Sequence, residues 1–236
     1  GDLGLSQFED KLSLAWPQCH NGDEAAFRWM TAFHRLMSGA AEGKAELVLV
    51  DVGPNLGAIN RSALIASDHV CFPLAPDLYS IQGMRNLGPT LRQWRQTWRS
   101  LLPKAPDDLR LPAGTMDPAG YVVMQHGKRD NRPVKAYLRW MDRIPQVYRD
   151  AVLQETPLLP TPVIAEDPHC LAQLKHYRSL MPLAMEAHKP MFFLRPADGA
   201  IGAHLDAVRA CREDFQALAI RIGDAAGISL EHAATI

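Results

Sequence analysis

Two short apolar runs alternate with helical stripes in the first half of the chain. Residues 47–50 read Leu-Val-Leu-Val before Asp51, and a second run covers 69–74 before Pro76. Continuous apolar runs of this length are typical of strands that are buried on both faces of a parallel sheet. Apolar residues at helical spacing predict helices over 23–41, 58–67 and 80–102.

The second half of the chain shows the same alternation. Residues 121–125 predict a third strand, and 163–165 and 189–194 are predicted to be extended. Further helices are predicted over 132–154, 168–187 and 201–223. Strands that alternate with helices predict a single α/β domain over 1–236, with a doubly wound, mostly parallel sheet and helices on both of its faces.

Three local signals refine this picture. Ser6 and Glu9 have the spacing of a capping box at the start of a helix. Pro89 is expected to kink or split the helix over 80–102, because proline lacks the N–H that the helix needs. The segment 103–118 is rich in proline, aspartate and glycine and is predicted to be a surface loop.

The composition is that of a globular protein. The 236 residues are 47% apolar and 22% charged, with a net charge of −1, so whole-chain charge gives no reason to expect nucleic acid or a membrane as partner. The sequence shows neither a run of about 18 apolar residues nor the pattern of a signal peptide. Four scattered cysteines without a C-x-x-C pair favour a reduced, cytoplasmic protein.

The strongest chemical candidate is Asp51, which closes the run at 47–50. A buried strand that ends in a carboxylate holds it rigidly at the sheet edge, where it can orient the water shell of a Mg²⁺ ion. Gly53 would let the backbone approach a terminal phosphate. Taken alone the pattern is weak, since many parallel strands end in Asp-x-Gly as simple turns.

Two later motifs strengthen it. Residues 51–57 read Asp-Val-Gly-Pro-Asn-Leu-Gly, 67–73 read Ser-Asp-His-Val-Cys-Phe-Pro, and 80–84 read Ser-Ile-Gln-Gly-Met. In this order and spacing they resemble the ParA/MinD family of P-loop ATPases, in particular the ParA-type proteins of chromosome and plasmid partitioning. The resemblance is good over about 44–90 and looser beyond. Gly53 stands where the family more often has proline.

The resemblance implies a binding site for ATP and Mg²⁺ in the complete protein. Asp51 would orient Mg²⁺ through water, and Gly53 and Pro54 would sense the γ-phosphate. Gln125 and Glu166 are expected near the base. The resemblance also implies an ATP-dependent homodimer and a partner protein that stimulates hydrolysis.

The family's phosphate loop, Lys-Gly-Gly-x-Gly-Lys-Thr, does not occur in this sequence. That loop supplies the backbone N–H cradle and the lysines that grip the phosphates. Because Gly1 to Ser6 also have turn chemistry, we expect an internal fragment or a trimmed chain that lacks the N-terminal strands. The chain alone is then expected to be catalytically silent, and to be poorly stable or to self-associate through the uncovered strand.

Basic residues suggest a second kind of partner. A dense set follows the predicted third strand and includes Arg129, Arg132, Lys135 and Arg139. It could bind DNA nonspecifically or an acidic partner, although a solvated helix face is the plainer interpretation. The same holds for Arg85, Arg92, Arg95 and Arg99 beside Trp94 and Trp98.

Two functional hypotheses remain open. The first is a ParA-type ATP-dependent switch in partitioning or cargo positioning. The second is a non-catalytic relative that keeps the fold and binds a partner. A metal site at His169, Cys170 and His176 is disfavoured, because the spacing fits no ordinary zinc site.

Overall fold

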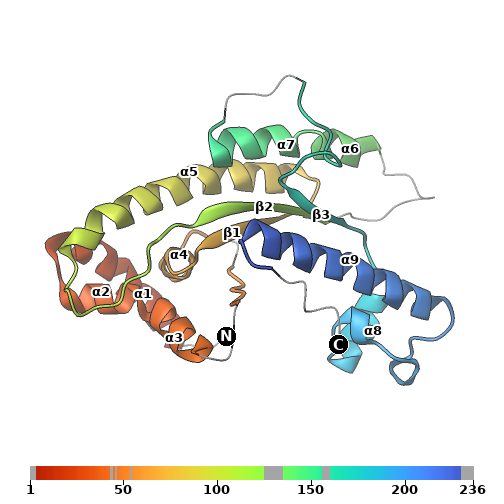
Figure 1. Ribbon diagram of the computed structural model, residues 1–236, viewed down its shortest axis with the longest axis horizontal. Coiled ribbons are helices and arrows are strands. Elements are labelled where there is room, and N and C mark those ends of the chain that lie inside the picture. The colour runs from red at the N-terminus through yellow and green to blue at the C-terminus, as the bar shows by residue number, and fades with distance from the viewer. Residues whose placement is uncertain are drawn as a thin grey trace. The chain divides into compact units, whose positions relative to one another are not determined.

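The computed structural model describes residues 4–42, 45, 47–53, 55–124, 135–155 and 160–229. The chain forms two compact units, each of which is assembled from two stretches of sequence (Figure 1). Unit 1 combines Gly1–Val70 with Asn86–Pro118, and unit 2 combines Cys71–Arg85 with Ala119–Ile236.

Unit 1 is helical. Its elements are α1 (Gly4–Gln18), the 3-10 turn η1 (Cys19–Asn21), α2 (Glu24–Met30), α3 (Ala32–Ala41), α4 (Ala58–Ile65), α5 (Leu78–Leu101) and the 3-10 turn η2 (Leu102–Lys104). The first turns of α5 belong to unit 2.

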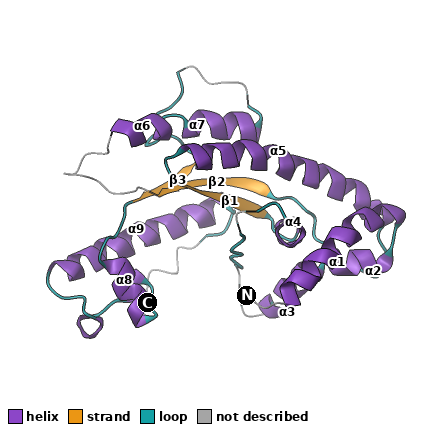
Figure 2. Cartoon of the chain, turned by 180° about the vertical axis from the view of Figure 1, so that it is seen from behind, coloured by secondary structure: helices purple, strands orange, loops and turns teal. Residues whose placement is uncertain are grey.

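Unit 2 contains the sheet. Its strands are β3 (Cys170–Leu174) and most of β1 (His69–Leu74) and β2 (Asp117–Met124). Its helices are α6 (Lys135–Met141), α7 (Ile144–Val147), the π-helix η3 (Tyr148–Leu153), α8 (Leu180–Ala187), the 3-10 turns η4 (Met191–Phe193) and η5 (Pro196–Asp198), and α9 (Ala203–Ala225). Figure 2 shows these strands among the helices.

Trp98 is the centre of the core of unit 1. Its side chain is fully buried, stacks on Trp16 with ring centroids 6.4 Å apart and contacts Phe27 at 6.0 Å. The indole N–H donates a hydrogen bond of 2.9 Å to the Pro112 carbonyl, so the polar atom of this large side chain is satisfied. Segments that are distant in sequence therefore share one aromatic core.

The sheet of unit 2 is parallel, with strand order β1-β2-β3. Tyr121 is opposite Cys170, and the register is irregular between Tyr121 and Val122. Just before it, Gly120 has φ of 134°, and a Cβ at this position would lie 2.6 Å from the His169 carbonyl oxygen. The close approach of the two strands therefore requires glycine here.

Helices cover both faces of this sheet. On one face Tyr148 of η3 packs against Phe72 and Tyr121, with ring centroids 5.8 and 5.1 Å apart. On the other face Val122, Leu171 and Leu174 form a cluster against the later half of α9. Figure 1 accordingly shows α7 and α9 on opposite sides of the strands. The predicted α/β class is confirmed, with a three-stranded parallel sheet flanked by helices.

A buried ion pair joins η3 to the segment before β3. The Arg149 guanidinium and the Asp167 carboxylate are 3% and 0% exposed, with a shortest N–O distance of 2.6 Å. Asp167 also accepts hydrogen bonds from the Tyr121 hydroxyl and the His169 N–H. Burial alone would raise the pKa of Asp167, but the hydrogen bonds from Arg149, Tyr121 and the His169 N–H hold that pKa below its ordinary value.

Several predicted elements are correct. The strand at 69–74 and the helices at 58–67 and 201–223 appear as β1, α4 and α9 with small changes of boundary. The predicted strand at 121–125 is β2, although its last residue, Gln125, lies outside the described residues.

Other predicted elements are corrected by the structure. The helix predicted over 168–187 is strand β3 followed by α8, because the run Cys170–Leu174 pairs with β2. The extended piece predicted over 189–194 contains the turn η4. The helix predicted over 23–41 is interrupted at Thr31, whose φ of −100° and ψ of 11° depart from helical values.

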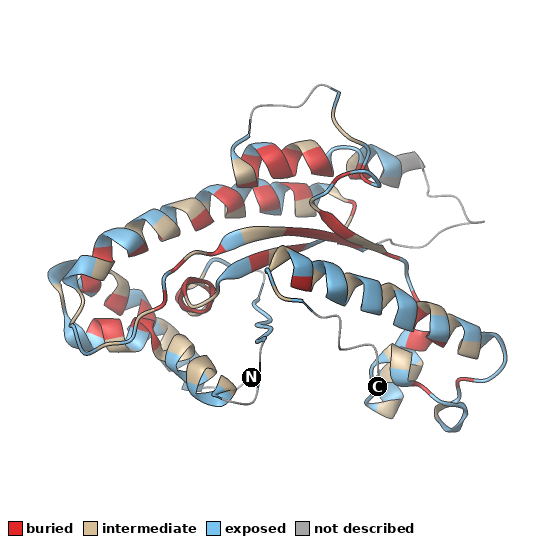
Figure 3. Cartoon of the chain, in the orientation of Figure 1, coloured by how far each residue is buried: buried red, intermediate tan, exposed pale blue. Residues whose placement is uncertain are grey.

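The largest correction concerns residues 47–50, which form no strand (Figure 2). Their side chains are exposed, and Leu49 is 76% accessible, so no strand partner or core covers this apolar run within the described residues (Figure 3). Apolar pattern alone predicted a buried strand, but a strand needs a neighbour to accept its backbone hydrogen bonds.

We predict that the Asp167→Asn variant lowers the free energy of unfolding by about 3–5 kcal/mol, because it leaves the buried Arg149 charge with only the half-exposed Glu155 carboxylate, at 3.7 Å, as a counter-charge. Urea unfolding followed by circular dichroism measures this. Asp206→Asn is the matched control, because the Asp206 side chain is 79% exposed in its ion pair with Arg209 and such surface pairs contribute little stability.

The same pair sets an acid dependence. The folded pKa of Asp167 lies below its unfolded value of about 3.9, so the pair stabilises the fold above that pH and this contribution is lost as pH falls through the folded pKa. The wild type should therefore lose stability more steeply below about pH 4 than Asp167→Asn. Parallel pH profiles for the two proteins would contradict this account.

Candidate functional site

The loop over residues 51–57, here called the switch loop, carries three of the five predicted nucleotide-site residues and leads into α4. Asp51 and Gly53 are both exposed, and Pro54 lies outside the described residues. The carboxylate of Asp51 makes no ion pair within the described part of the chain. The structure thus places Asp51 and Gly53 in one loop of unit 1.

Asn60 folds the switch loop back onto α4. Asn60 is 7% exposed, and its side-chain amide nitrogen donates hydrogen bonds of 2.7 Å to the carbonyl oxygens of both Gly53 and Asn55. The Asn55 side-chain oxygen in turn accepts a 2.9 Å hydrogen bond from the Gly57 N–H. The loop backbone is therefore held by side-chain hydrogen bonds rather than by a sheet.

Glu9 binds the N-terminus of α4. Its two carboxylate oxygens accept hydrogen bonds from the N–H groups of Ala58, at 2.5 Å, and Ile59, at 2.7 Å. The first N–H groups of a helix have no partner within the helix, and the helix dipole favours negative charge there. Gly57, the residue before α4, has no side chain that could serve instead. The Glu9 carboxylate of α1 therefore caps α4 in place of a residue next to the helix in sequence.

The two glycines of the switch loop differ in the space around them. A Cβ at Gly57 would lie 2.7 Å from the Glu9 carboxylate and 2.9 Å from the Asn55 side-chain oxygen. A Cβ at Gly53 would meet nothing closer than 3.7 Å, so the proline common in the family at this place has room for its Cβ. A side chain at position 57 would therefore clash with the Glu9 carboxylate, whereas a Cβ at position 53 would not clash with its neighbours.

Arg61 continues the site on the next turn of α4. Its guanidinium carbon lies 4.5 Å from the ring centre of Trp16 and 5.8 Å from that of Trp94. Burial lowers the pKa of Arg61, and the nearby Glu9 charge offsets part of that effect. The buried Nε atom has no hydrogen-bond partner among the described residues. Cation–π contacts therefore compensate for much of the water that this arginine loses.

These residues fit only one side of a site for ATP and Mg²⁺. Asp51 is an exposed carboxylate at the end of an apolar run, as the role of orienting a hydrated cation requires. No Gly-Lys-Ser/Thr sequence is present to cradle phosphates. The first backbone N–H groups of α4, those of Ala58 and Ile59, donate to Glu9 and are not available to a phosphate. The phosphate-gripping side does not fit, and we derive no catalytic step from this chain alone.

The remaining predicted nucleotide-site residues belong to unit 2. Glu166 is exposed in a turn where its N–H donates a 2.9 Å hydrogen bond to the Val163 carbonyl. Gln125 lies outside the described residues. Their approach to a nucleotide base stays a prediction.

The predicted DNA-facing residues are only partly described. Arg129 and Arg132 lie outside the described residues, Lys135 is the first residue of α6, and Arg139 is exposed on the same helix. Within the described residues, no three His, Cys, Asp or Glu side chains come together as a metal site. No helix there is long and apolar enough to cross a membrane.

Sequence reasoning missed the two residues that organise the switch loop. Glu9 was assigned to a capping box with Ser6, but Ser6 is inside α1 and the Glu9 carboxylate reaches α4 instead. Nothing in the sequence signals a contact between residues about fifty positions apart. Asn60 left a weak signal, as a polar residue within an otherwise apolar helical stripe.

A solved structure shares the parallel sheet with helices on both faces. The crystal structure of protein DIP2308 from Corynebacterium diphtheriae superposes with a TM-score of 0.54 over 95% of this chain, at 16% sequence identity. The chain covers 64% of that protein, and at this identity the likeness concerns the fold alone.

Sequence comparison adds a family resemblance. A protein-family model described as an AAA domain matches residues 30–103, which include the switch loop and α4. A ParA family protein from Chlamydia pneumoniae is 31% identical over 67 residues, which are 28% of this chain and 26% of that protein. Both matches cover less than a third of the chain, and within that part they support the resemblance to ParA-like P-loop ATPases that the motifs predicted.

We predict that Glu9→Gln lowers the free energy of unfolding by about 0.5–2 kcal/mol, since it removes the charge that caps two helix N–H groups. Chemical unfolding at neutral pH measures the loss. The adjacent, exposed Asp10, changed to Asn, is the matched control and should have little effect. Equal losses for the two variants would show that the α4 contact contributes nothing specific.

Proposed function

We propose that this chain is part of a ParA-type ATP-dependent switch protein, in which the switch loop responds to the terminal phosphate of ATP. The observation that supports this best is the arrangement of residues 51–60. A loop with the family's motif is held by only a few side-chain hydrogen bonds, and it leads directly into a helix whose N-terminus binds a carboxylate. A short, weakly held segment of this kind can change conformation at low cost.

The proposed roles follow the family resemblance residue by residue. Asp51 orients Mg²⁺ through its water shell, and the backbone around Gly53 and Pro54 senses the γ-phosphate. Gln125 and Glu166 contribute to the side of the site near the base. ATP and Mg²⁺ are the ligands of the complete protein.

The phosphate cradle is proposed to come from residues outside this sequence. The exposed run at 47–50 supports this, because Val48 and Leu49 are 45% and 76% accessible although their pattern suits a buried strand. A neighbouring strand that carries the phosphate loop would cover this run and pair with its backbone. The incomplete coverage of both relatives is consistent with a longer protein.

The biological role proposed is partitioning or positioning of DNA or another cargo in the cytoplasm. ATP closes a homodimer, and a partner protein stimulates hydrolysis and opens it. In this role the protein would bind DNA nonspecifically through Arg129, Arg132, Lys135 and Arg139.

A non-catalytic scaffold is the second candidate. It is favoured by one observation, namely that the free amides of α4 are already bound by Glu9 while the sequence contains no Gly-Lys-Ser/Thr. The gene sequence upstream of Gly1 separates the two. An in-frame Lys-Gly-Gly-x-Gly-Lys-Thr supports the switch, and a start codon at this point supports the scaffold.

We predict that the protein extended through such a phosphate loop binds ATP in the presence of Mg²⁺, whereas the 236-residue chain does not. Isothermal titration calorimetry measures both. Asp51→Asn should weaken binding by about tenfold or more in Mg²⁺ and have little effect in EDTA, because its role depends on the cation. Asp68→Asn, an exposed turn residue, is the matched control. An extended protein that binds no ATP would refute the proposal.

A further inference from the structure

Asn60 is a buried polar side chain on a helix whose other buried positions are small or apolar. Its side-chain nitrogen lies 2.7 Å from the carbonyl oxygens of Gly53 and Asn55 and 3.1 Å from the Asn55 side-chain oxygen. Three oxygens around one atom identify it as the amide nitrogen, since the side-chain oxygen of asparagine has no proton to donate. The nitrogen carries two protons, so three acceptors share two donors.

Asn60 sets the orientation of the loop backbone. No backbone N–H within the described part of the chain donates to the carbonyl of Gly53 or of Asn55. In a trans peptide unit the C=O and the N–H point in opposite directions. Because the Asn55 carbonyl points toward Asn60, the N–H of the same peptide unit, which belongs to Leu56, points away from the Asn60 side chain. Asn60 therefore sets the direction of a loop N–H that it does not contact.

The Leu56 N–H is accessible to a ligand. Leu56 is 45% exposed, and its N–H makes no hydrogen bond to the residues that the structure describes. The peptide unit held at Gly53 offers no equivalent donor, because residue 54 is proline. Outward backbone N–H groups in loops are donors of the kind that bind phosphate oxygens. Of the two peptide units that Asn60 holds, the one between Asn55 and Leu56 is therefore the one that can donate.

We propose that Asn60 is a positioning residue that determines the preference of the switch loop for ATP over ADP, by directing the Leu56 N–H at the terminal phosphate. The role rests on the switch function proposed above, because it requires that the loop meets this phosphate. ADP lacks the terminal phosphate, so the hydrogen bond forms with ATP alone. Asn60 contacts neither the nucleotide nor Mg²⁺ and acts through the loop backbone.

A purely structural role for Asn60 predicts a different outcome. Its loss would then weaken the binding of ATP and ADP alike, or lower the stability of the fold alone. Ser62 of the same helix has such a structural role, because it is fully buried and its hydroxyl donates a 2.7 Å hydrogen bond to the Met30 carbonyl. Ser62→Ala is therefore the matched control.

Isothermal titration calorimetry tests the proposal on the protein extended through a phosphate loop, with adenylyl imidodiphosphate and with ADP in the presence of Mg²⁺. Asn60→Asp keeps the shape of the side chain but places a carboxylate oxygen against three other oxygens. It should reduce the ratio of the two affinities by about tenfold, by weakening the binding of the triphosphate analogue. Ser62→Ala should lower the thermal unfolding temperature and keep the ratio.

The amide resonance of Leu56 gives a second readout. In the ¹⁵N-labelled wild type, the analogue should shift the Leu56 amide proton downfield relative to ADP, because the N–H donates to a charged oxygen. Asn60→Ala removes the donor without adding a charge, so it serves even where Asn60→Asp fails to fold. It should lower the affinity ratio and abolish the difference in shift.

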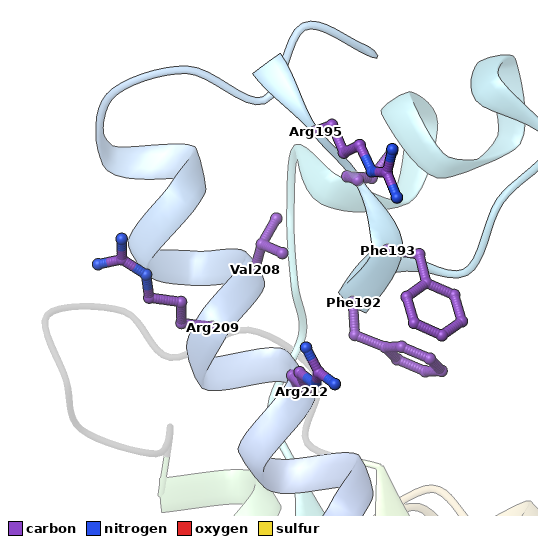
Figure 4. A pocket seen from close by; sticks show the side chains of 7 residues that line it. Phe192, Phe193, Arg195, Val208, Arg209 and Arg212 are labelled. Carbon is purple, nitrogen blue, oxygen red and sulfur yellow. The ribbon is translucent and has the colours of Figure 1, made fainter. Parts of the chain in front are cut away.

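Nucleotide bound elsewhere on the chain would obscure the ratio. A pocket of about 380 Å³ in unit 2 is lined by residues of 192–195 and 208–212, among them Phe193 and Arg195 (Figure 4). Arginine binds phosphate well and stacks on aromatic faces, so this pocket is the rival site to exclude. Arg195→Ala is the second control and should leave both affinities unchanged.

The proposal is overturned if both Asn60 variants keep the wild-type ratio, or if Ser62→Ala or Arg195→Ala lowers it as much as they do. A wild type that prefers the analogue while its Leu56 amide proton does not shift would also overturn it. A wild-type extended protein that binds neither nucleotide refutes the switch itself, so the failure of the switch is distinguishable from the failure of the role of Asn60.

Discussion

The contact between the Glu9 carboxylate and the first amides of α4 is the constraint on which the candidate site depends. One carboxylate satisfies two helix N–H groups that have no partner of their own, and it fixes where α4 begins. Because Asn60 on that helix binds the backbone of the switch loop, the position of α4 also determines the course of the loop. The loop that carries Asp51 is therefore positioned by a helix near the N-terminus rather than by a sheet.

Unit 2 is held together by apolar contacts to its sheet and by one buried ion pair. Its parallel sheet is covered on both faces, by aromatic contacts to η3 and by aliphatic contacts to α9, and the buried Arg149–Asp167 pair ties η3 to the approach of β3. A buried ion pair contributes little net stability but penalises any arrangement that separates the charges. The same helix α9 covers the sheet with its later turns and packs with Val208 and Cys211 into a second apolar cluster with its earlier turns, so one helix belongs to both clusters.

The sequence predicted elements well where local pattern and tertiary setting agree. The class of fold, β1, α4 and α9 follow from apolar periodicity, and the resemblance to ParA-like ATPases follows from the ordered motifs between Asp51 and Met84. Prediction failed where pairing with a neighbouring strand decides the secondary structure. The run Cys170–Leu174 fits a helical stripe as well as a strand until β2 pairs with it, and 47–50 fits a buried strand that lacks a partner here. The Glu9 cap joins positions too distant in sequence for any local rule.

In the proposed switch, the loop over 51–57 responds to the terminal phosphate of ATP. Amide hydrogen exchange tests it most directly, in the protein extended through a phosphate loop, with a non-hydrolysable ATP analogue and with ADP. The analogue is expected to slow exchange of the amides from Val52 to Gly57 relative to ADP, while the core amides of α9 exchange alike in both states. Equal exchange of the switch loop in the two nucleotide states would contradict it.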